Sequence, residues 1–380
     1  MLLLVKIDNG LWRLKNRLLL LNLGGPRRTE EIPKFLKDLF EDPLVFDLPL
    51  PEFLRIRLAR KIAESRAKKV AETYASMGFG GGSPLVEETE KQAEELRKLL
   101  EESGERWEVK TAMCCGYPDL RELPKDWTDP NLGVVILPLF PHFSRSTVLS
   151  TAMLMEKSLG FCPASSRGWV RPFSDRQEYL YSVRDLILDF FNGSLKKSGF
   201  LHYEPTPIPD WENLDLVFSA HGIPLRLIRK GDVYTKEVEK NVESLTQLLR
   251  EKGFQGKIHL SYQSRVGPSK WTSPNTLDKI KELGETGTKR VAIYPISFVS
   301  DHLETLEEIG VQIRDHAYSY GIRDYYRIPA PGCYPTFLEA LAKFVFEARH
   351  SLNQGDYGPC ICRSSGGFKP EKEGKVCHGV

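Results

Sequence analysis

A short stretch of the chain, YPISFVSDHLETLEEIG at residues 294–310, concentrates side chains that can bind a metal or move a proton. Its histidine, His302, follows Asp301 and precedes Glu304 and Glu308. Imidazole and carboxylate groups bind divalent transition metals and exchange protons. Because Glu304 and Glu308 are four residues apart, an α-helix would place them on one face, where they repel each other when both are ionised. The alternative interpretation is a charged helix face that meets only solvent.

The segment that leads into this stretch predicts where it lies in the fold. VAIYPISFV is apolar, β-branched and aromatic, which is typical of a buried strand, and it runs directly into Ser300 and Asp301. Either residue is a suitable N-cap for the helix that the following residues predict. The acidic residues and His302 would thus lie where the carboxyl end of a strand meets a helix. Open α/β sheets bind ligands at that edge.

A second histidine, His221, follows another predicted strand. It lies in SAHGIP, directly after the apolar segment LDLVF. A histidine in a loop is often incidental, but Ala220 and Gly222 leave room for this imidazole, and the position is again at a strand's carboxyl end. His221 together with His302 and Glu304 predicts a site for a borderline divalent metal or for proton acceptance.

Three aromatic residues, Tyr262, Trp271 and Phe298, lie on predicted loops at strand ends in the same half of the chain. Such side chains either pack into the core or form a flat wall for a planar ligand. Both interpretations stay open at this point.

The composition is that of an ordinary globular protein. The chain has 380 residues, enough for two domains, with 41% hydrophobic and 27% charged residues. A net charge of +2 gives no reason to expect nucleic acid as a partner. No apolar run reaches the roughly 18 residues of a membrane-spanning helix, and no secretory signal precedes the seven cysteines. We expect a cytoplasmic protein, in which the apolar segment VFDLPLPEFL (45–54) is either an ordinary loop or a contact with a membrane surface.

Strand and helix patterns alternate along the chain and predict an α/β protein with parallel sheets. LLLLNLGGP parallels LVFSAHGIP, and GVVILPLFPHFSRST parallels RVAIYPISFVSDHLET, which favours two similar domains, each a parallel sheet flanked by helices, with a ligand cleft between them. The predicted boundaries are a leader at 1–17, an N-terminal domain at 18–165, a C-terminal domain at 166–350 and a cysteine-containing tail at 351–380.

Six segments together resemble the ferrochelatase family. They occur in the order and approximate spacing of that family, over roughly Leu18 to Val345: LNLGGP, GGGSPL, LPLFPHFSRST, FSAHGIPLR, YQSRVGPSKWTSP and SFVSDHLETLEE. The resemblance implies two Rossmann-like, chelatase-like domains with the active site in a cleft between them. It also implies a lyase of haem biosynthesis that inserts ferrous iron, Fe²⁺, into a porphyrin, which we expect to be protoporphyrin IX.

The resemblance further implies roles for individual residues. His221 resembles the active-site histidine that accepts pyrrole protons or binds the incoming metal, and Glu304 resembles the carboxylate that faces it. The other implied positions form a proton or metal relay (Asp301, His302 and Glu308) and line the porphyrin cleft (Tyr74, Ser83, Trp271 and Phe298).

Two positions depart from the family pattern. Many relatives carry an Arg-Tyr pair where this chain has Cys114-Cys115, which bears on the contact to porphyrin propionates, and Gln312 stands where an acidic line continues in some relatives. Three alternatives therefore stay open: a coproporphyrin III ferrochelatase, a chelatase that places cobalt or nickel in another tetrapyrrole, and a non-catalytic tetrapyrrole-binding protein.

Cysteines near the C-terminus raise the question of a cofactor. Several ferrochelatases hold a [2Fe–2S] cluster on one internal and three C-terminal cysteines, and such a cluster needs four thiolates. The corresponding candidates here are Cys162, Cys360, Cys362 and Cys377. The alternative is free reduced thiols on a Gly- and Lys-rich tail. Peripheral contact with the inner membrane is a further implication, and the oligomeric state stays open.

Overall fold

The chain folds into two compact units. The computed structural model describes residues 4–6, 12–14, 16–76, 79–127, 133–159, 168–196, 200, 207–265 and 269–354. The first unit comprises residues 1–139, 143–172 and 341–380, and the second comprises residues 140–142 and 173–340. The boundaries expected from the sequence stay a prediction. The compact units differ from them mainly because residues from Leu341 onward group with the first unit.

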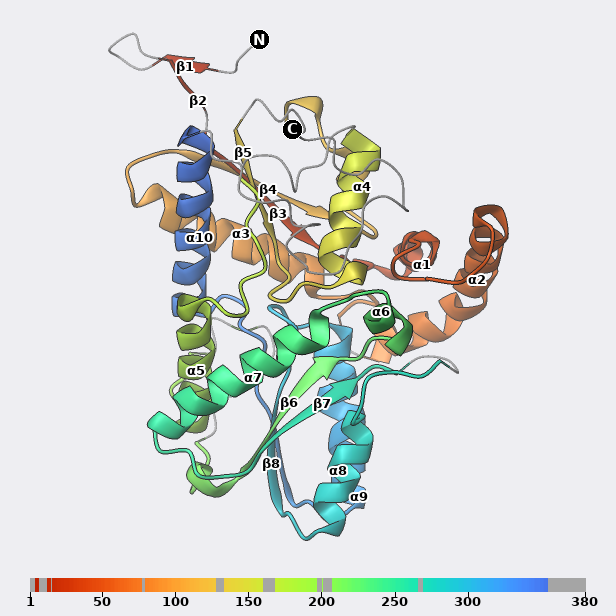
Figure 1. The fold of residues 1–380 in the computed structure, drawn as a ribbon, viewed down its shortest axis with the longest axis vertical. Coiled ribbons are helices and arrows are strands. Elements are labelled where there is room, and N and C mark those ends of the chain that lie inside the picture. Colours follow the sequence, from red (N-terminus) through yellow and green to blue (C-terminus); the bar gives the residue numbers. More distant parts are fainter. Residues whose placement is uncertain are drawn as a thin grey trace. The chain divides into compact units, whose positions relative to one another are not determined.

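The first unit is built on a three-stranded parallel sheet in the order β4-β3-β5 (Figure 1). The central strand β3 (Asn16–Asn22) lies between β4 (Trp107–Met113) and β5 (Val134–Pro138). Leu18 to Leu21 are fully buried, as expected for an apolar strand in the middle of a parallel sheet. The helices of this unit are α1 (Ile32–Glu41), α2 (Glu52–Ser76), α3 (Leu85–Glu101), which packs on β4, and α4 (Ser150–Leu159).

Shorter elements accompany this sheet. An antiparallel pair, β1 (Leu4–Lys6) and β2 (Trp12–Leu14), precedes β3. Single turns of 3₁₀-helix and a π-helical turn before α4 connect the larger elements: η1 (Thr29–Glu31), η2 (Leu120–Glu122), η3 (Lys125–Trp127) and η5 (Arg145–Leu149).

The second unit carries a four-stranded parallel sheet in the order β7-β6-β8-β9. Its central strand β6 (Asp215–His221) pairs with β7 (Ile258–Gln263) and β8 (Arg290–Tyr294), and β9 (Asp324–Arg327) is at the edge. The remaining elements are α5 (Gln177–Phe191), η7 (Trp211–Asn213), α6 (Leu225–Arg229), α7 (Tyr234–Glu251), α8 (Thr276–Glu285), the π-helix η8 (Glu304–Ile313), α9 (Arg314–Ser319) and the start of α10 (Pro335–Gln354). Two parallel sheets with flanking helices confirm the predicted fold class.

The segment between β8 and η8 differs from its sequence-based prediction. Strand β8 ends at Tyr294, because Pro295 has no N–H with which to continue the ladder, so Phe298 lies on a loop rather than in the strand. The helix begins only at Glu304, and neither Ser300 nor Asp301 caps it, so the predicted N-cap is wrong. The carboxylate of Asp301 accepts hydrogen bonds from other groups, described below, and is not available to the helix.

The π-helix η8 is anchored by apolar side chains on its inner face. Ile309 and Ile313 are buried in a cluster with Val217 of β6, Ile293 of β8 and Ile280 of α8. Burial of such side chains stabilises a helix on its sheet by about 1.5–3 kcal/mol each. This packing fixes the start of η8, and thereby Glu304, at the carboxyl end of the second sheet.

Candidate active site

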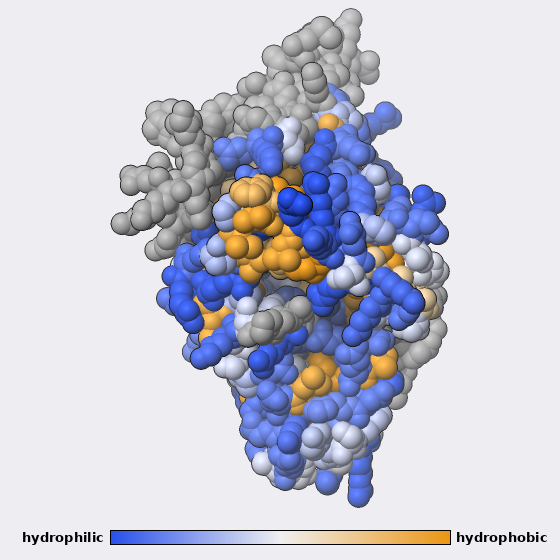
Figure 2. All heavy atoms as spheres, turned by 90° about the vertical axis from the view of Figure 1, so that its right-hand side faces the viewer, coloured by the Kyte–Doolittle hydropathy of each residue, from blue (hydrophilic) through white to orange (hydrophobic). Residues whose placement is uncertain are grey.

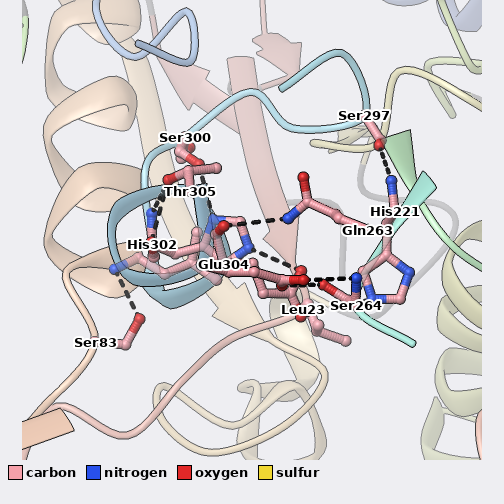
Figure 3. Close-up of polar contacts among 12 residues, drawn as sticks. Leu23, Ser83, His221, Gln263, Ser264, Ser297, Ser300, His302, Glu304 and Thr305 are labelled. Carbon is pink, nitrogen blue, oxygen red and sulfur yellow. Dashed lines mark hydrogen bonds and ion pairs between the residues drawn. The ribbon is translucent and has the colours of Figure 1, made fainter. Parts of the chain in front are cut away.

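Three predicted site residues meet at the carboxyl end of the second sheet. His221 is the last residue of β6, and Glu304 is the first residue of η8. The Nε2 of His221 lies 3.6 Å from Glu304 Oε1, and the Nε2 of His302 lies 3.6 Å from Glu304 Oε2 (Figure 3). One carboxylate therefore faces two imidazoles, as the sequence predicts from strand-end positions alone.

Backbone and hydroxyl groups hold the two histidines in place. The backbone N–H of His221 donates to Ser297 Oγ at 2.6 Å, which ties the end of β6 to the loop after β8. The Nδ1 of His302 lies 3.2 Å from the carbonyl oxygen of Ser300. Because a carbonyl only accepts, Nδ1 of His302 carries the proton, and in the neutral ring Nε2 presents its lone pair toward Glu304.

The electrostatics of the pair favour the charged forms of both groups. Burial alone lowers the pKa of His221, but the charge of Glu304, its hydrogen bond and the charge of Glu308 outweigh this effect and raise the pKa to about 9. Burial likewise raises the pKa of Glu304, whereas the charge and hydrogen bonds of His221 and His302 lower it well below its ordinary value. At neutral pH the site therefore contains an imidazolium beside a carboxylate.

Phe298 lies against both imidazoles. Its ring centroid is 4.5 Å from that of His302 and 6.2 Å from that of His221, with the latter pair edge to face. Such contacts restrict the orientation of an imidazole that would otherwise rotate about its side-chain bonds. Phe298 thus contacts the site, although its half-buried ring does not by itself distinguish packing from ligand binding.

Trp271 lies beside the residue after His221. It pairs with Pro224 in an isolated antiparallel bridge, and an added Cβ on Gly222 would lie 3.4 Å from its ring and 2.7 Å from the carbonyl oxygen of Gln263. The glycine therefore serves the close approach of backbone and indole next to His221, and not only the room of the imidazole.

The two other relay candidates occupy different surroundings. Asp301 is buried, and both of its oxygens accept from Arg327 Nη1 at 3.0 Å, with the N–H of Ala330 as a further donor. Glu308 accepts from the N–H of Ser264 at 2.7 Å and from its hydroxyl at 2.5 Å. Asp301 is thus bound in an ion pair, whereas Glu308 is held by neutral donors one helical turn beyond Glu304.

The predicted residues of the first unit lie in its interior. Tyr74 and Ser83 are buried, and the hydroxyl of Ser83 accepts from the N–H of Leu85 at the start of α3. Cys114 and Cys115 are buried too, and burial raises the pKa of Cys114 to about 12. These thiols are uncharged at neutral pH, so they cannot replace the charge of an arginine.

Two further predictions concern residues beyond the site. Gln312 is exposed, and its amide lies 3.4 Å from Glu307. The four candidate cluster cysteines lie outside the described residues: Cys162, Cys360, Cys362 and Cys377.

Sequence reasoning missed three polar residues that hold the site. Ser297 binds the end of β6, Ser264 binds Glu308, and Gln263 donates from Nε2 to the backbone carbonyl of Glu304 at 3.1 Å. Ser264 and Gln263 belong to the segment YQSRVGP, whose position after a strand is the signal that could have identified them. Small hydroxyl and amide side chains carry no spacing pattern of their own, so only their contacts reveal the role.

Within the residues that the structure describes, no three His, Cys, Asp or Glu side chains converge as a metal-binding set, and no helix is long and apolar enough to span a membrane. The fold and the site define an α/β protein with a histidine–carboxylate pair at a sheet edge, a class suited to proton transfer and to transient metal contact.

Comparison with known proteins identifies the family. The profile described as "Ferrochelatase" matches residues 15–349. "Ferrochelatase" of Leptospira borgpetersenii serovar Hardjo-bovis (strain JB197) is 59% identical over 366 residues, 96% of this chain and 99% of that protein. "Ferrochelatase" of Leptospira biflexa serovar Patoc (strain Patoc 1 / Ames) is 53% identical over 92% of this chain and 95% of that protein. "Ferrochelatase-2, chloroplastic" of Oryza sativa subsp. indica is 39% identical over 87% of this chain and 61% of that protein.

The chain belongs to the ferrochelatase family. The sequence-based prediction of a metal-inserting lyase of haem biosynthesis, with ferrous iron and a porphyrin as substrates, is confirmed.

Proposed function

We propose that this protein inserts Fe²⁺ into protoporphyrin IX, and that His221 and Glu304 carry out the reaction. The observation that supports this assignment most directly is the 3.6 Å approach of His221 to Glu304 at the carboxyl end of the second sheet. Metal insertion exchanges two pyrrole N–H protons for one dication, so the site must accept protons while it admits a positive ion. A histidine–carboxylate pair can do both.

The protonated state of His221 sets an order of events. An imidazolium cannot accept a proton, so the Nε2 proton must leave before His221 takes one from a pyrrole nitrogen or binds the metal. The arrival of Fe²⁺ beside Glu304 favours this loss, because the dication repels the imidazolium and competes for the same carboxylate. In this proposal His302, Glu308 and Asp301 serve as the route by which protons or the metal move past Glu304.

The assay follows the visible spectrum of protoporphyrin IX with purified protein and Fe²⁺ under anaerobic conditions, or with Zn²⁺ in air. Wild type is expected to form the metalloporphyrin, whereas His221→Ala and Glu304→Gln bind porphyrin and stay folded without inserting metal. A spectral change on porphyrin binding that never proceeds to metallation would favour a non-catalytic tetrapyrrole-binding protein instead.

The porphyrin itself is the finer part of the proposal. Coproporphyrin III is the alternative substrate, and the two differ in the number of carboxylate side chains, four against two. The ratio of kcat/KM for the two porphyrins, measured at equal Fe²⁺, decides between them. Tyr74, Ser83, Trp271 and Phe298 stay predictions for the porphyrin-binding surface. Competition between Fe²⁺, Co²⁺ and Ni²⁺ tests the remaining chelatase alternative.

The [2Fe–2S] cluster is a separate hypothesis from the chelatase function. Its proposed ligands are Cys162, Cys360, Cys362 and Cys377, and the alternative is four free thiols. Iron and acid-labile sulfide analysis of anaerobically purified protein separates the two. A colourless, sulfide-free protein with full activity would contradict the cluster.

A peripheral membrane contact is proposed at the start of α2. Phe53 is 64% exposed, and Leu54 and Leu58, four residues apart on one helix face, are also exposed. The exposed Arg57 and Lys61 lie on the same two turns. Figure 2 shows apolar side chains beside hydrophilic ones on the face that carries α1 and α2. Apolar residues with flanking cations suit the surface of an anionic bilayer.

Co-sedimentation with vesicles of phosphatidylglycerol and phosphatidylethanolamine tests this contact. Phe53→Ser with Leu54→Ser is expected to lower the bound fraction severalfold, while Leu277→Ser, an equally exposed leucine of α8, behaves as wild type. Equal binding of all three proteins would leave a cytoplasmic protein without membrane contact as the better description.

A further inference from the structure

Ser264, the residue directly after β7, has a backbone conformation that serine rarely adopts. Its φ is +64°, in the left-handed region that favours glycine. Among the residues that the structure describes, Asp210 (φ +50°) is the other non-glycine residue in this region. Strained conformations of this kind persist where the surrounding structure holds them, and they cluster at functional sites.

The conformation lets Ser264 give two hydrogen bonds to one carboxylate. Its N–H donates to Glu308 Oε1 at 2.7 Å, and its hydroxyl donates to Glu308 Oε2 at 2.5 Å (Figure 3). A glycine would adopt the same backbone without strain but would supply only the N–H. Both oxygens of Glu308 are thus fixed in direction by a residue of β7's carboxyl end, beside the strand end that carries His221.

We propose that Ser264 is a positioning residue, which holds the Glu308 carboxylate as the next proton acceptor beyond the His221–Glu304 pair. This inference rests on the proposed function. The two protons displaced by Fe²⁺ leave the pyrrole nitrogens, and each passes as H⁺ to a base of the site and then to a carboxylate that releases it to water. Glu308 can take this role only if its carboxylate is ionised and correctly oriented before the proton arrives.

The surroundings of Glu308 explain why such a residue is needed. Burial and the charge of Glu304 raise the pKa of Glu308, whereas the two hydrogen bonds from Ser264 and the charge of His221 oppose this rise. Without the hydroxyl, the neutral carboxylic acid would be favoured and one oxygen would lose its partner.

A purely structural role makes a different prediction. If Ser264 served only to turn the chain after β7, Ser264→Gly would relieve strain and leave turnover unchanged. If its hydroxyl positions Glu308, both Ser264→Gly and Ser264→Ala lower turnover, although their effects on the backbone are opposite. Asp210→Gly is the matched control, because it relieves the same kind of strain at an exposed residue whose side chain makes no capping hydrogen bond.

The experiment measures kcat and KM for protoporphyrin IX with Zn²⁺ between pH 6 and 9, together with thermal unfolding and porphyrin binding. We expect Ser264→Ala and Ser264→Gly to lower kcat about tenfold, the size of one hydrogen bond to a charged group, with KM unchanged. The acid limb of the pH–rate profile should move to higher pH, because Glu308 ionises less readily. Asp210→Gly should keep the wild-type profile.

A double-mutant cycle makes the test specific. In a Glu308→Gln background, Ser264→Gly should cause no further change in kcat or in the pH profile, since the group it positions is absent. An equal loss in both backgrounds, or wild-type kinetics in Ser264→Gly, would overturn the inference while leaving the proposed function intact. Wild-type protein that inserts no metal would overturn both.

Discussion

Replacing Glu304 by glutamine removes the negative charge that faces His221 across 3.6 Å. Two unit charges at this separation attract by about 1.2 kcal/mol in water and about 4.6 kcal/mol at an effective dielectric constant of 20. At 1.36 kcal/mol per pKa unit, this corresponds to a change of about 0.8 to 3.4 in pKa. Because the two side chains are 35% and 32% exposed, the effect should lie between these limits.

The pKa of about 9 for His221 agrees with this range, since histidine ordinarily has a value of 6.5. In Glu304→Gln the burial that lowers the pKa of His221 stays, while the main opposing charge is lost. We therefore expect the pKa to fall from about 9 to near or below 6.5. Glu308→Gln should lower it less, because the charge of Glu308 acts after that of Glu304.

Titration of the His221 Cε1–H resonance by NMR, in wild type and both variants, measures these values directly. His221→Gln assigns the resonance, and the other histidines report whether the fold has changed. A wild-type value near 6.5, or a value near 9 that survives in Glu304→Gln, would refute the electrostatic account of the pair.

The remaining predictions concern stability. The raised pKa of His221 means that its pairing stabilises the fold fully below about pH 6.5 and that this stabilisation is lost as pH rises through about 9; the difference in free energy of unfolding between wild type and Glu304→Gln should shrink over that window, and a constant difference would speak against it. Asp301→Ala leaves Arg327 without its carboxylate and should cost about 3–5 kcal/mol in urea unfolding, whereas Asp315→Ala, in an exposed pair with Arg314, should cost less than about 1 kcal/mol. Ile309→Ala should cost about 2–5 kcal/mol by creating a cavity under η8, and a smaller loss would show that this core does not anchor the site. Gly222→Ala should destabilise by about 1–3 kcal/mol, because its Cβ would meet the backbone oxygen of Gln263; wild-type stability would contradict that contact.

The fold was accessible from the sequence because apolar strands and amphipathic helices alternate with clear periods. The run at Leu18 to Leu21 has the uninterrupted apolar pattern of a central parallel strand, and it forms β3. The segment LDLVFSAH forms β6, with His221 as its last residue rather than in the loop beyond it. Parallel pairing then brings strand ends together, which is why His221 and Glu304 were predictable as neighbours.

The segment from Pro295 to Glu304 was not predictable in the same way. Its residues are apolar enough for a strand, but the missing N–H of Pro295 ends the ladder, and Asp301 contributes to an ion pair with Arg327 instead of an N-cap. A partner 26 residues away leaves no local signal. The π-helical winding of η8 is equally invisible, because its apolar residues Ile309 and Ile313 have the spacing of an ordinary α-helix.

The most direct measurement of the central claim is anaerobic metal insertion by wild type, His221→Ala and Glu304→Gln, with porphyrin binding and thermal unfolding recorded on the same samples. Wild type should convert protoporphyrin IX and Fe²⁺ into haem, while both variants stay folded, bind the porphyrin and form haem at less than about one-hundredth of the wild-type rate, as expected when a proton-transfer group is lost. Turnover at the wild-type rate in both variants would contradict the assignment of His221 and Glu304 to the reaction.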